Sequence, residues 1–189
     1  YVGKGMTGGM LAIYPAKGAT FAKNGFTIAG NTCLYGATGG RLYAAGKVGE
    51  RFAVRNSGAL AVVEGTGDNC CEYMTGGVVV VLGCTGVNFG AGMTGGFAYL
   101  LDEQDDLALR LNPELVEALD VSTPILQEHL RSLLHQHLEE TGSDKAQKIL
   151  NDFGSYLSKF KLVKPKTSDV NTLLGHRARS SAELRVQAM

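Results

Sequence analysis

Short apolar runs recur along the N-terminal half of the chain. They are rich in β-branched and aromatic residues, and each begins one or two positions after a glycine. The runs occupy residues 11–14, 26–28, 42–44, 60–63, 78–81 and 97–100. Runs of this composition and length, bounded by glycine, predict short β-strands.

The glycines that precede these runs form an internal repeat. Thr-Gly-Gly occurs at 7–9, 38–40, 75–77 and 94–96, and Asn24-Gly25 and Ser57-Gly58 are weaker copies. The last glycines of successive copies are separated by 16, 15, 18, 19 and 19 residues. A second, poorer run often precedes the glycine, in residues 32–35, 52–55 and 70–73. One period therefore contains a strand, a turn, a second strand and a glycine-rich corner.

The length of this period decides the fold class that we expect. A strand with a crossover helix needs about 30 residues, so a doubly wound α/β sheet is excluded. Corners that recur in the same phase indicate a chain that coils in one direction, each turn stacking about 4.8 Å above the last. We predict that residues 1–101 form a mainly β fold, a right-handed parallel β-helix (a single-stranded solenoid) of about six coils.

The glycines have a structural role in such a coil. At a sharp corner the backbone often needs a positive φ, and the next coil passes close by, so a Cβ atom would cause strain and a clash. We expect replacement of Gly76 or Gly95 by valine to lower the free energy of unfolding by at least about 1 kcal/mol, because β-branched residues tolerate the left-handed region poorly.

The pattern changes beyond residue 101. Of 26 glycines, 23 precede residue 102, and the stretch 101–106, with four acidic side chains, is typical of a solvated connector. Helix starts follow at Asn112-Pro113, Thr123-Pro124 and Ser143. We predict that residues 102–189 form an α-helical tail that packs on the coil or caps it. The open end of a β-helix exposes unpaired backbone, so the tail should cover one end or one flank.

Apolar stripes define the three predicted helices. Their members are Leu115, Val116 and Leu119 in the first; Leu126, Leu130, Leu133, Leu134 and Leu138, ending near Gly142, in the second; and Ala146, Ile149, Leu150, Phe153, Tyr156, Leu157 and Phe160 in the third. Lys164-Pro165-Lys166 should end the last helix. The remaining anchors are Leu173, Leu174, Leu184 and Val186.

Charge and cysteine content restrict the partners and the location. Eighteen basic and eighteen acidic side chains cancel, so neither nucleic acid nor a membrane is an expected partner. The longest apolar runs are much shorter than the roughly 20 residues of a membrane-spanning helix. Cys33, Cys70, Cys71 and Cys84 show no CxxC spacing, so we expect buried reduced thiols and a cytoplasmic location. Because Tyr1 lies inside a repeat, we expect a piece of a longer protein.

Residues 3–8 and 90–95 match GxGxxG, a pattern associated with dinucleotide phosphates. In a nucleotide site these glycines must open a helix, because the helix N-terminus holds the pyrophosphate. Strand-like residues follow both copies here. We therefore interpret the glycines as structural.

Candidate catalytic and metal-binding residues are few. The acids of the coil are Glu50, Glu64, Asp68 and Glu72. A β-helix that cleaves polysaccharide needs such groups gathered on one outer face, but a solvated loop explains them more simply. No two of His129, His135 and His137 are four residues apart, so solvated or edge positions are expected. We predict no catalytic, cofactor-binding or metal-binding residue in this chain.

The repeats and the tail resemble a known family. Residues 3–9, 36–40 and 90–96 resemble the GxGxG-repeat domain at the C-terminus of glutamate synthase large subunits. Residues 112–116, 162–166, 174–177 and 182–185 look like the extreme C-terminus of that subunit in the bacterial NADPH-dependent class. A subunit of formylmethanofuran dehydrogenase carries a similar β-helix and is an alternative.

The resemblance implies a non-catalytic scaffold domain of a larger enzyme. Such a parent transfers the amide nitrogen of glutamine to 2-oxoglutarate, giving glutamate. It uses FMN, a [3Fe-4S] cluster, and NADPH that acts through a FAD-containing small subunit. The implied partners are the amidotransferase and synthase domains and that small subunit, and the fragment itself should hold no cofactor.

Two questions stay open at this stage. One alternative function is an independent β-helix module that binds carbohydrate or nucleotide. The basic segment His176 to Arg179 is either a docking strip or a solvated face. An uncovered first coil could also let the fragment self-associate.

Overall fold

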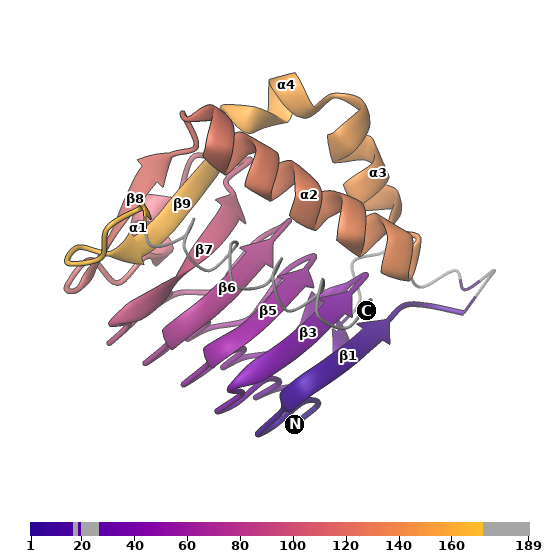
Figure 1. Ribbon diagram of the computed structural model, residues 1–189, viewed down its shortest axis with the longest axis horizontal. Helices are drawn as coiled ribbons and strands as arrows, with labels where there is room; N and C mark the ends of the chain where they lie inside the picture. Colours follow the sequence, from indigo (N-terminus) through magenta and orange to yellow (C-terminus); the bar gives the residue numbers. More distant parts are fainter. Residues whose placement is uncertain (17–18, 20–26, 172–189) are drawn as a thin grey trace, which may run out of the picture.

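The computed structural model describes residues 1–16, 19 and 27–171 of the chain. Five strands stack side by side in parallel, and they follow one another in sequence order (Figure 1). They are β1 (Thr7–Ile13), β3 (Gly39–Ala44), β5 (Ser57–Val63), β6 (Thr75–Val81) and β7 (Gly95–Leu101). The predicted mainly β fold with a parallel solenoid is confirmed, with about four turns.

The main sheet contains five parallel strands and not the six expected, because one sequence repeat adds no strand to it, and five stacked strands are joined by about four turns. Asn24-Gly25 lies outside the described residues, and the run after it gives β2 (Thr27–Ala29). β2 pairs with β4 (Lys47–Val48) in a separate two-stranded sheet, while β1 pairs directly with β3. The first coil therefore takes up two of the repeats.

The second wall of the solenoid is not made of strands. The prediction of strands at 32–35, 52–55 and 70–73 is wrong, because left-handed residues alternate there: φ is 56° at Leu34, 57° at Ala53 and 59° at Cys71. Hydrogen bonds between coils hold this wall together. The amides of Ala53 and Cys71 both donate to the preceding coil, at 2.9 Å from the carbonyl oxygens of Cys33 and Phe52. Positive φ is uncommon in non-glycine residues, and the hydrogen bonds between coils stabilise this conformation here.

The two glycines of a Thr-Gly-Gly corner serve different purposes. At Gly96 φ is 76°, as expected for a left-handed corner residue. Gly95 has no positive φ, but a Cβ on it would meet the carbonyl oxygen of Thr75 in the preceding coil. Gly76 stands in the same relation to Ser57. Valine at Gly76 or Gly95 is therefore expected to lower the free energy of unfolding because the backbones approach closely there, and not because of a left-handed φ.

Both faces of the main sheet are buried, which explains why its strands appear in the sequence as continuous apolar runs. Side chains such as Val79 point into the solenoid, and those such as Val80 point outward. The outward set packs against α2 (Pro124–Thr141), which crosses the sheet, and against α3 (Asp144–Asn151) and α4 (Phe153–Leu157) (Figure 1). The helices thus share a core with the solenoid.

The tail also contributes two strands, which the sequence patterns did not predict. After the short α1 (Leu107–Arg110) come β8 (Val116–Asp120) and, beyond the helices, β9 (Phe160–Pro165). β9 runs antiparallel between β7 and β8. The first predicted helix is therefore wrong, because pairing with β9 outweighs the helical pattern of its apolar residues.

The end of the third predicted helix is also wrong. Its apolar stripe is divided between α3 and α4, and Phe160 begins β9. Lys164 and Pro165 do not terminate a helix, since both belong to β9. Alternate residues of a strand buried on both faces cannot be distinguished from a helical stripe by periodicity over so few residues.

The second predicted helix is confirmed at both ends. The Thr123 hydroxyl accepts from the Leu126 amide at 3.4 Å, Pro124 follows, and Gly142 ends the helix with φ 65°. No helix in the described part of the chain is long and apolar enough to cross a membrane. The anchors predicted from Leu173 to Val186 and the basic segment His176 to Arg179 lie outside the described residues.

The close approach of coils predicts that Gly95→Ala lowers the free energy of unfolding by about 1–3 kcal/mol, because Cβ would meet backbone, which cannot rotate away. Gly30→Ala is the matched control, since a Cβ there meets nothing within 4 Å. The control should change stability by less than about 0.5 kcal/mol. Chemical denaturation measures both variants, and equal losses would contradict the assigned contact.

Candidate functional site

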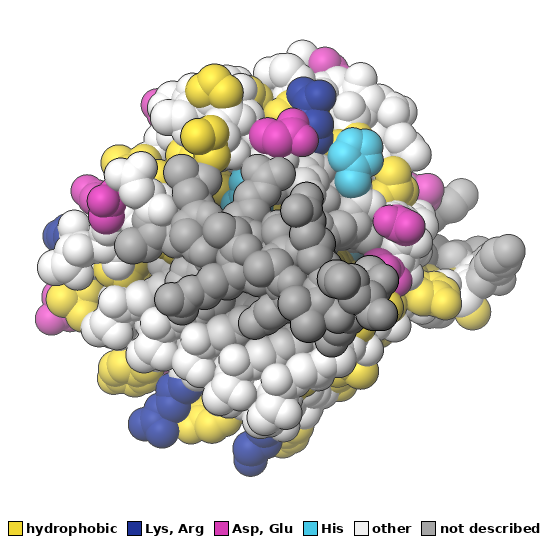
Figure 2. Space-filling model, in the orientation of Figure 1, with side chains coloured by type: hydrophobic (Ala, Val, Ile, Leu, Met, Phe, Trp, Pro, Cys, Tyr) yellow, Lys and Arg dark blue, Asp and Glu magenta, His cyan; other side chains and the backbone are white. Residues whose placement is uncertain are grey.

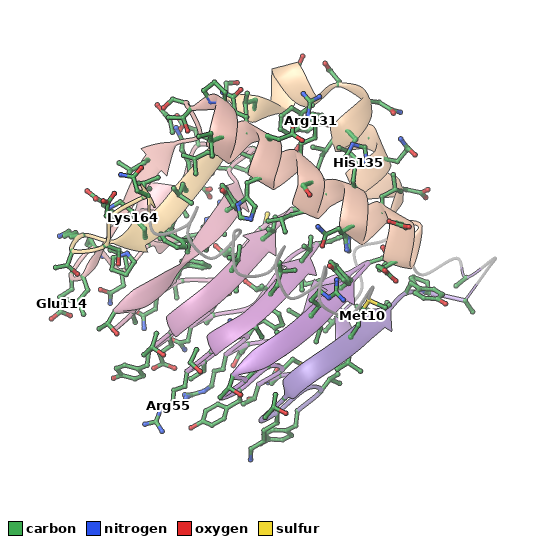
Figure 3. All side chains as sticks on the ribbon, in the orientation of Figure 1. Met10, Arg55, Glu114, Arg131, His135 and Lys164 are labelled. Atoms are coloured by element: carbon green, nitrogen blue, oxygen red, sulfur yellow. The ribbon has the colours of Figure 1, made fainter. Side chains whose placement is uncertain are left out.

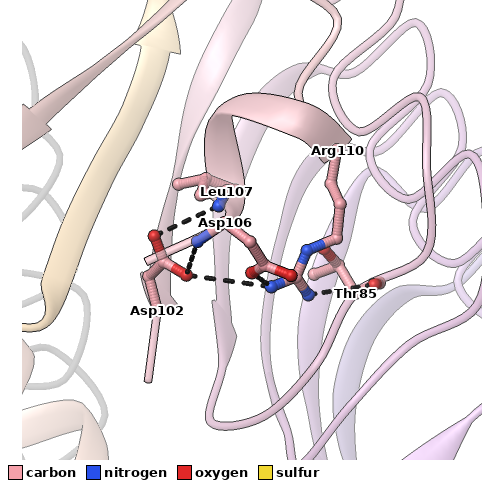
Figure 4. A network of polar contacts seen from close by, with 5 residues as sticks. All are labelled: Thr85, Asp102, Asp106, Leu107 and Arg110. Atoms are coloured by element: carbon pink, nitrogen blue, oxygen red, sulfur yellow. Dashed lines mark hydrogen bonds and ion pairs between the residues drawn. The ribbon is translucent and has the colours of Figure 1, made fainter. Parts of the chain in front are cut away.

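Polar contacts gather where the tail meets the last coil, around Asp102 (Figure 4). Its carboxylate accepts from the amides of Asp106 and Leu107 at 3.1 and 3.2 Å, which satisfies the first N–H groups of α1. The guanidinium of Arg110 lies 3.7 Å from the same carboxylate and also pairs with Asp106. Asp102 is buried, so the prediction of a solvated connector is wrong at this residue.

Arg110 extends this network to the solenoid. Its Nη1 donates to the carbonyl oxygen of Thr85 at 3.1 Å, in the loop between β6 and β7. A hollow of about 10 Å³ beside Leu107 is no larger than one water molecule requires. The network therefore fastens the tail to the coil and leaves no room for a substrate in this hollow.

A second polar cluster joins α2 to the solenoid. His137 Nε2 lies 3.4 Å from Glu64 Oε1, and the Ser143 hydroxyl donates to the same oxygen. His137 is fully buried and packs against the ring of Tyr43, so the prediction of a solvated or edge position is wrong for His137. Glu64, which the sequence placed in a solvated loop, is only partly exposed, because His137 and Ser143 contact its carboxylate.

Serine, histidine and glutamate together suggest a hydrolase triad, but their geometry differs from one. The Ser143 hydroxyl contacts Glu64 and not His137, and it accepts from the Ala146 amide at 3.0 Å as the N-cap of α3. A nucleophilic serine must be hydrogen-bonded to its base. The cluster therefore acts as a helix cap and an inter-element contact.

The other candidate residues each contact a different partner and do not form a common site. Asp68 accepts from the Val87 amide at 2.9 Å, and Glu72 pairs with Arg51 at 3.3 Å. His129 Nδ1 lies 3.0 Å from the Tyr99 hydroxyl, whereas His135 is exposed on α2, as Figure 3 shows. No group of three or more His, Cys, Asp or Glu in the described residues could hold a metal ion.

The GxGxxG motifs lead into strands, as predicted. Residues 3–8 run into β1 and residues 90–95 into β7. Neither copy opens a helix, so the amides and dipole that hold pyrophosphate in a dinucleotide site are not positioned after these glycines.

The wall opposite α2 carries cations beside aromatic rings. Lys4 Nζ lies 5.6 Å from the ring centre of Tyr1 and 5.8 Å from that of Tyr35. Arg55 projects from the same side (Figure 3), and the space-filling view shows basic and apolar side chains together along that edge (Figure 2). Rings with adjacent cations are common in protein interfaces, so this wall is a candidate contact face.

The cysteines are all free thiols, and three of the four are buried as expected. The prediction is wrong for Cys84, which is exposed. Burial, with the neighbouring Cys70 thiol, raises the pKa of Cys71 well above its ordinary value. Cys71 is therefore a poor nucleophile.

The sequence patterns missed the residues that fasten the tail. A signal existed for Asp106 and Arg110, which are four residues apart on one helix turn. No signal existed for Glu64 and His137, which lie 73 positions apart. Their contact depends on where α2 crosses the sheet.

The fold and these contacts define the class of protein: a parallel β-solenoid domain whose buried polar groups hold its own parts together. Residues 1–166 match the family model described as the GXGXG motif, so the chain belongs to that family.

Relatives with curated names are glutamate synthases. The chloroplastic ferredoxin-dependent glutamate synthase of Spinacia oleracea is 56% identical over 170 residues, which cover 89% of this chain and 10% of that protein. Ferredoxin-dependent glutamate synthase 2 of Synechocystis sp. is 56% identical over 170 residues, covering 89% and 11%. The NADH glutamate synthase of Schizosaccharomyces pombe is 52% identical over 166 residues, covering 88% and 8%. The chain thus corresponds to the GXGXG region of glutamate synthases and spans about a tenth of their length.

The Asp102 network predicts that Asp102→Ala lowers the free energy of unfolding by about 2–4 kcal/mol, because two amides and a partly buried guanidinium lose their acceptor. Glu103→Ala is the control, since Glu103 makes only a partly exposed ion pair with Lys145, at 3.8 Å. It should cost less than about 0.5 kcal/mol. Urea denaturation of both variants checks this, and a neutral Asp102→Ala would disprove the role.

The thiol environments predict selective alkylation. In the folded chain iodoacetamide should modify Cys84 readily and leave Cys33, Cys70 and Cys71 unmodified, whereas all four should react in denaturant. Mass spectrometry of the labelled peptides measures this. Rapid labelling of Cys71 without unfolding would contradict its burial.

Proposed function

We propose that this chain is a non-catalytic structural domain of a glutamate synthase, a rigid prism that holds neighbouring catalytic domains in register. One observation carries the proposal: the carboxylates of Asp102 and Glu64 are bound by amides, a guanidinium, an imidazole and a hydroxyl of the domain's own elements. A rigid stack of coils with outward faces suits a spacer between domains. The length of the relatives, about ten times that of the matching region, is consistent with such neighbours.

The parent reaction belongs to the same proposal. It is the reductive transfer of the glutamine amide nitrogen to 2-oxoglutarate, giving glutamate, with FMN and a [3Fe-4S] cluster in the synthase domain. The proposed partners are the amidotransferase and synthase domains of the same polypeptide. We assign the parent to the bacterial NADPH-dependent class, with a FAD-containing small subunit, because of the tail residues 174–177 and 182–185. The relatives' names specify ferredoxin or NADH instead, so a reductant assay of the parent decides the class.

Other parts of the proposal concern the organisation of the chain. We place the boundary between the coil and the tail at residues 101 and 102, and the parent in the cytoplasm. We assign no catalytic, cofactor-binding or metal-binding residue to this chain. The separated domain would self-associate through its first coil, because that coil leaves Val2 and Met10 exposed.

The scaffold proposal predicts that Gly95→Ala in the whole parent enzyme lowers the temperature of half-inactivation but leaves kcat within about twofold at 25 °C. The reason is that Gly95 acts through coil stacking and not through the reaction. Gly30→Ala is again the control. A large loss of kcat in enzyme that retains wild-type stability would contradict a purely structural role.

Ligand titration separates the scaffold from a binding module. We expect the 189-residue chain to show no saturable binding of FMN, NADPH or acidic oligosaccharides in calorimetry, while the whole enzyme binds its flavin. Saturable binding with a Kd of about 1 μM, equivalent to roughly 8 kcal/mol, would favour the alternative module.

A further inference from the structure

Five positions on the wall opposite α2 share one backbone geometry but carry very different side chains. Gly5, Gly36, Arg55, Tyr73 and Gly92 occupy the same place in successive coils, and φ lies between 54° and 66° at all five. The amides of the first four each donate to a carbonyl oxygen of the next coil, at 2.8–2.9 Å. Glycine adopts this left-handed conformation without strain, whereas a residue with a Cβ atom is strained there. Arg55 and Tyr73 therefore need a reason other than the backbone.

The solenoid core does not supply that reason. Leu34, Ala53 and Cys71 are also left-handed, but their side chains are buried and fill the core. Arg55 is exposed and Tyr73 is 54% exposed, so neither side chain contributes much to the interior. Strained backbone that persists without a packing reason points to a function outside the fold.

The ring of Tyr73 is held in place by a glycine of the next coil. A Cβ atom on Gly92 would lie 2.4 Å from two carbons of this ring. The absence of a side chain at Gly92 thus leaves room for the ring to rest on the wall, while about half of its surface faces outward. An aromatic side chain that is already positioned loses little conformational entropy when a partner covers it.

The charges of this wall are unbalanced. Arg51 pairs with Glu72 at 3.3 Å. No ion pair within the described part of the chain includes Lys4 or Arg55. Arg55 projects away from α2 (Figure 3), and basic and apolar side chains lie together along that edge (Figure 2). Arginine and tyrosine are enriched in protein interfaces, so this wall complements a protein segment that carries carboxylates.

We propose that the wall around Arg55 and Tyr73 is an interaction surface for an acidic segment of a neighbouring domain in the parent polypeptide. A carboxylate of that segment accepts from the Arg55 guanidinium, and an apolar side chain beside it covers the Tyr73 ring. This surface rests on the proposed function only in that the chain is one domain of a larger protein. The neighbouring domain thus meets the solenoid on the face opposite α2.

Hydroxyl-radical footprinting of the whole parent protein tests this surface. An interface core excludes water, so Tyr73 should be oxidised at least about tenfold more slowly in the native than in the denatured protein, whereas a ring left 54% exposed would be slowed only about twofold. Arg55→Glu should remove most of this protection, because it places like charges together, and Arg55→Lys should retain part of it. Lys148→Glu, the same change of charge on α3, is the control and should leave Tyr73 protected.

Photo-crosslinking identifies the occupant. Benzoylphenylalanine in place of Tyr73 should cross-link, within one parent polypeptide, to a segment outside this domain that contains Asp or Glu. Three outcomes would overturn the proposal: oxidation of Tyr73 at the exposed rate in the native parent, equal protection in Arg55→Glu and Lys148→Glu, or a cross-link to a second copy of the parent. Failure of the scaffold proposal appears instead as a loss of kcat in Gly95→Ala, which this footprint does not measure.

Discussion

The structure depends on the close approach of successive backbones at the corner that opens each strand. The coils stack through parallel ladders, and at Gly76 and Gly95 the preceding carbonyl oxygen occupies the space that a Cβ would need. The ladder spacing of about 4.8 Å therefore fixes both the pitch of the coil and the residue type at this position. This contact explains why the repeat is strongest in its glycines, while the apolar runs between them vary freely in sequence.

A sheet buried on both faces imposes the second requirement. The inward side chains fill the solenoid, but the outward ones, such as Val80 and Tyr99, need a cover. α2 supplies it, and the polar contacts of Glu64 and Asp102 hold the cover in place. A domain buries polar groups mostly where they are hydrogen-bonded, and here such groups lie at the junction of the tail and the coil.

Sequence patterns predicted the parts of the fold that local rules control. The period of the glycines gave the parallel coil, and Thr123-Pro124 with Gly142 gave the bounds of α2. They failed where pairing between distant segments decides the structure: residues 116–120 and 160–165 became strands because each finds the other beside β7. The wall through Ala53 and Cys71 was missed because positive φ in such residues has no compositional signal.

For the candidate site, the structural interpretation of GxGxxG followed from the strands after it, but the burial of His137 could not be inferred without its partner.

The tail closes the solenoid at its last coil. At the last coil β9 pairs antiparallel with β7, and Lys164, on β9, is held by Glu117 of β8 at 2.7 Å. A parallel stack cannot continue past an antiparallel strand without losing the corner geometry, so the tail ends the prism there.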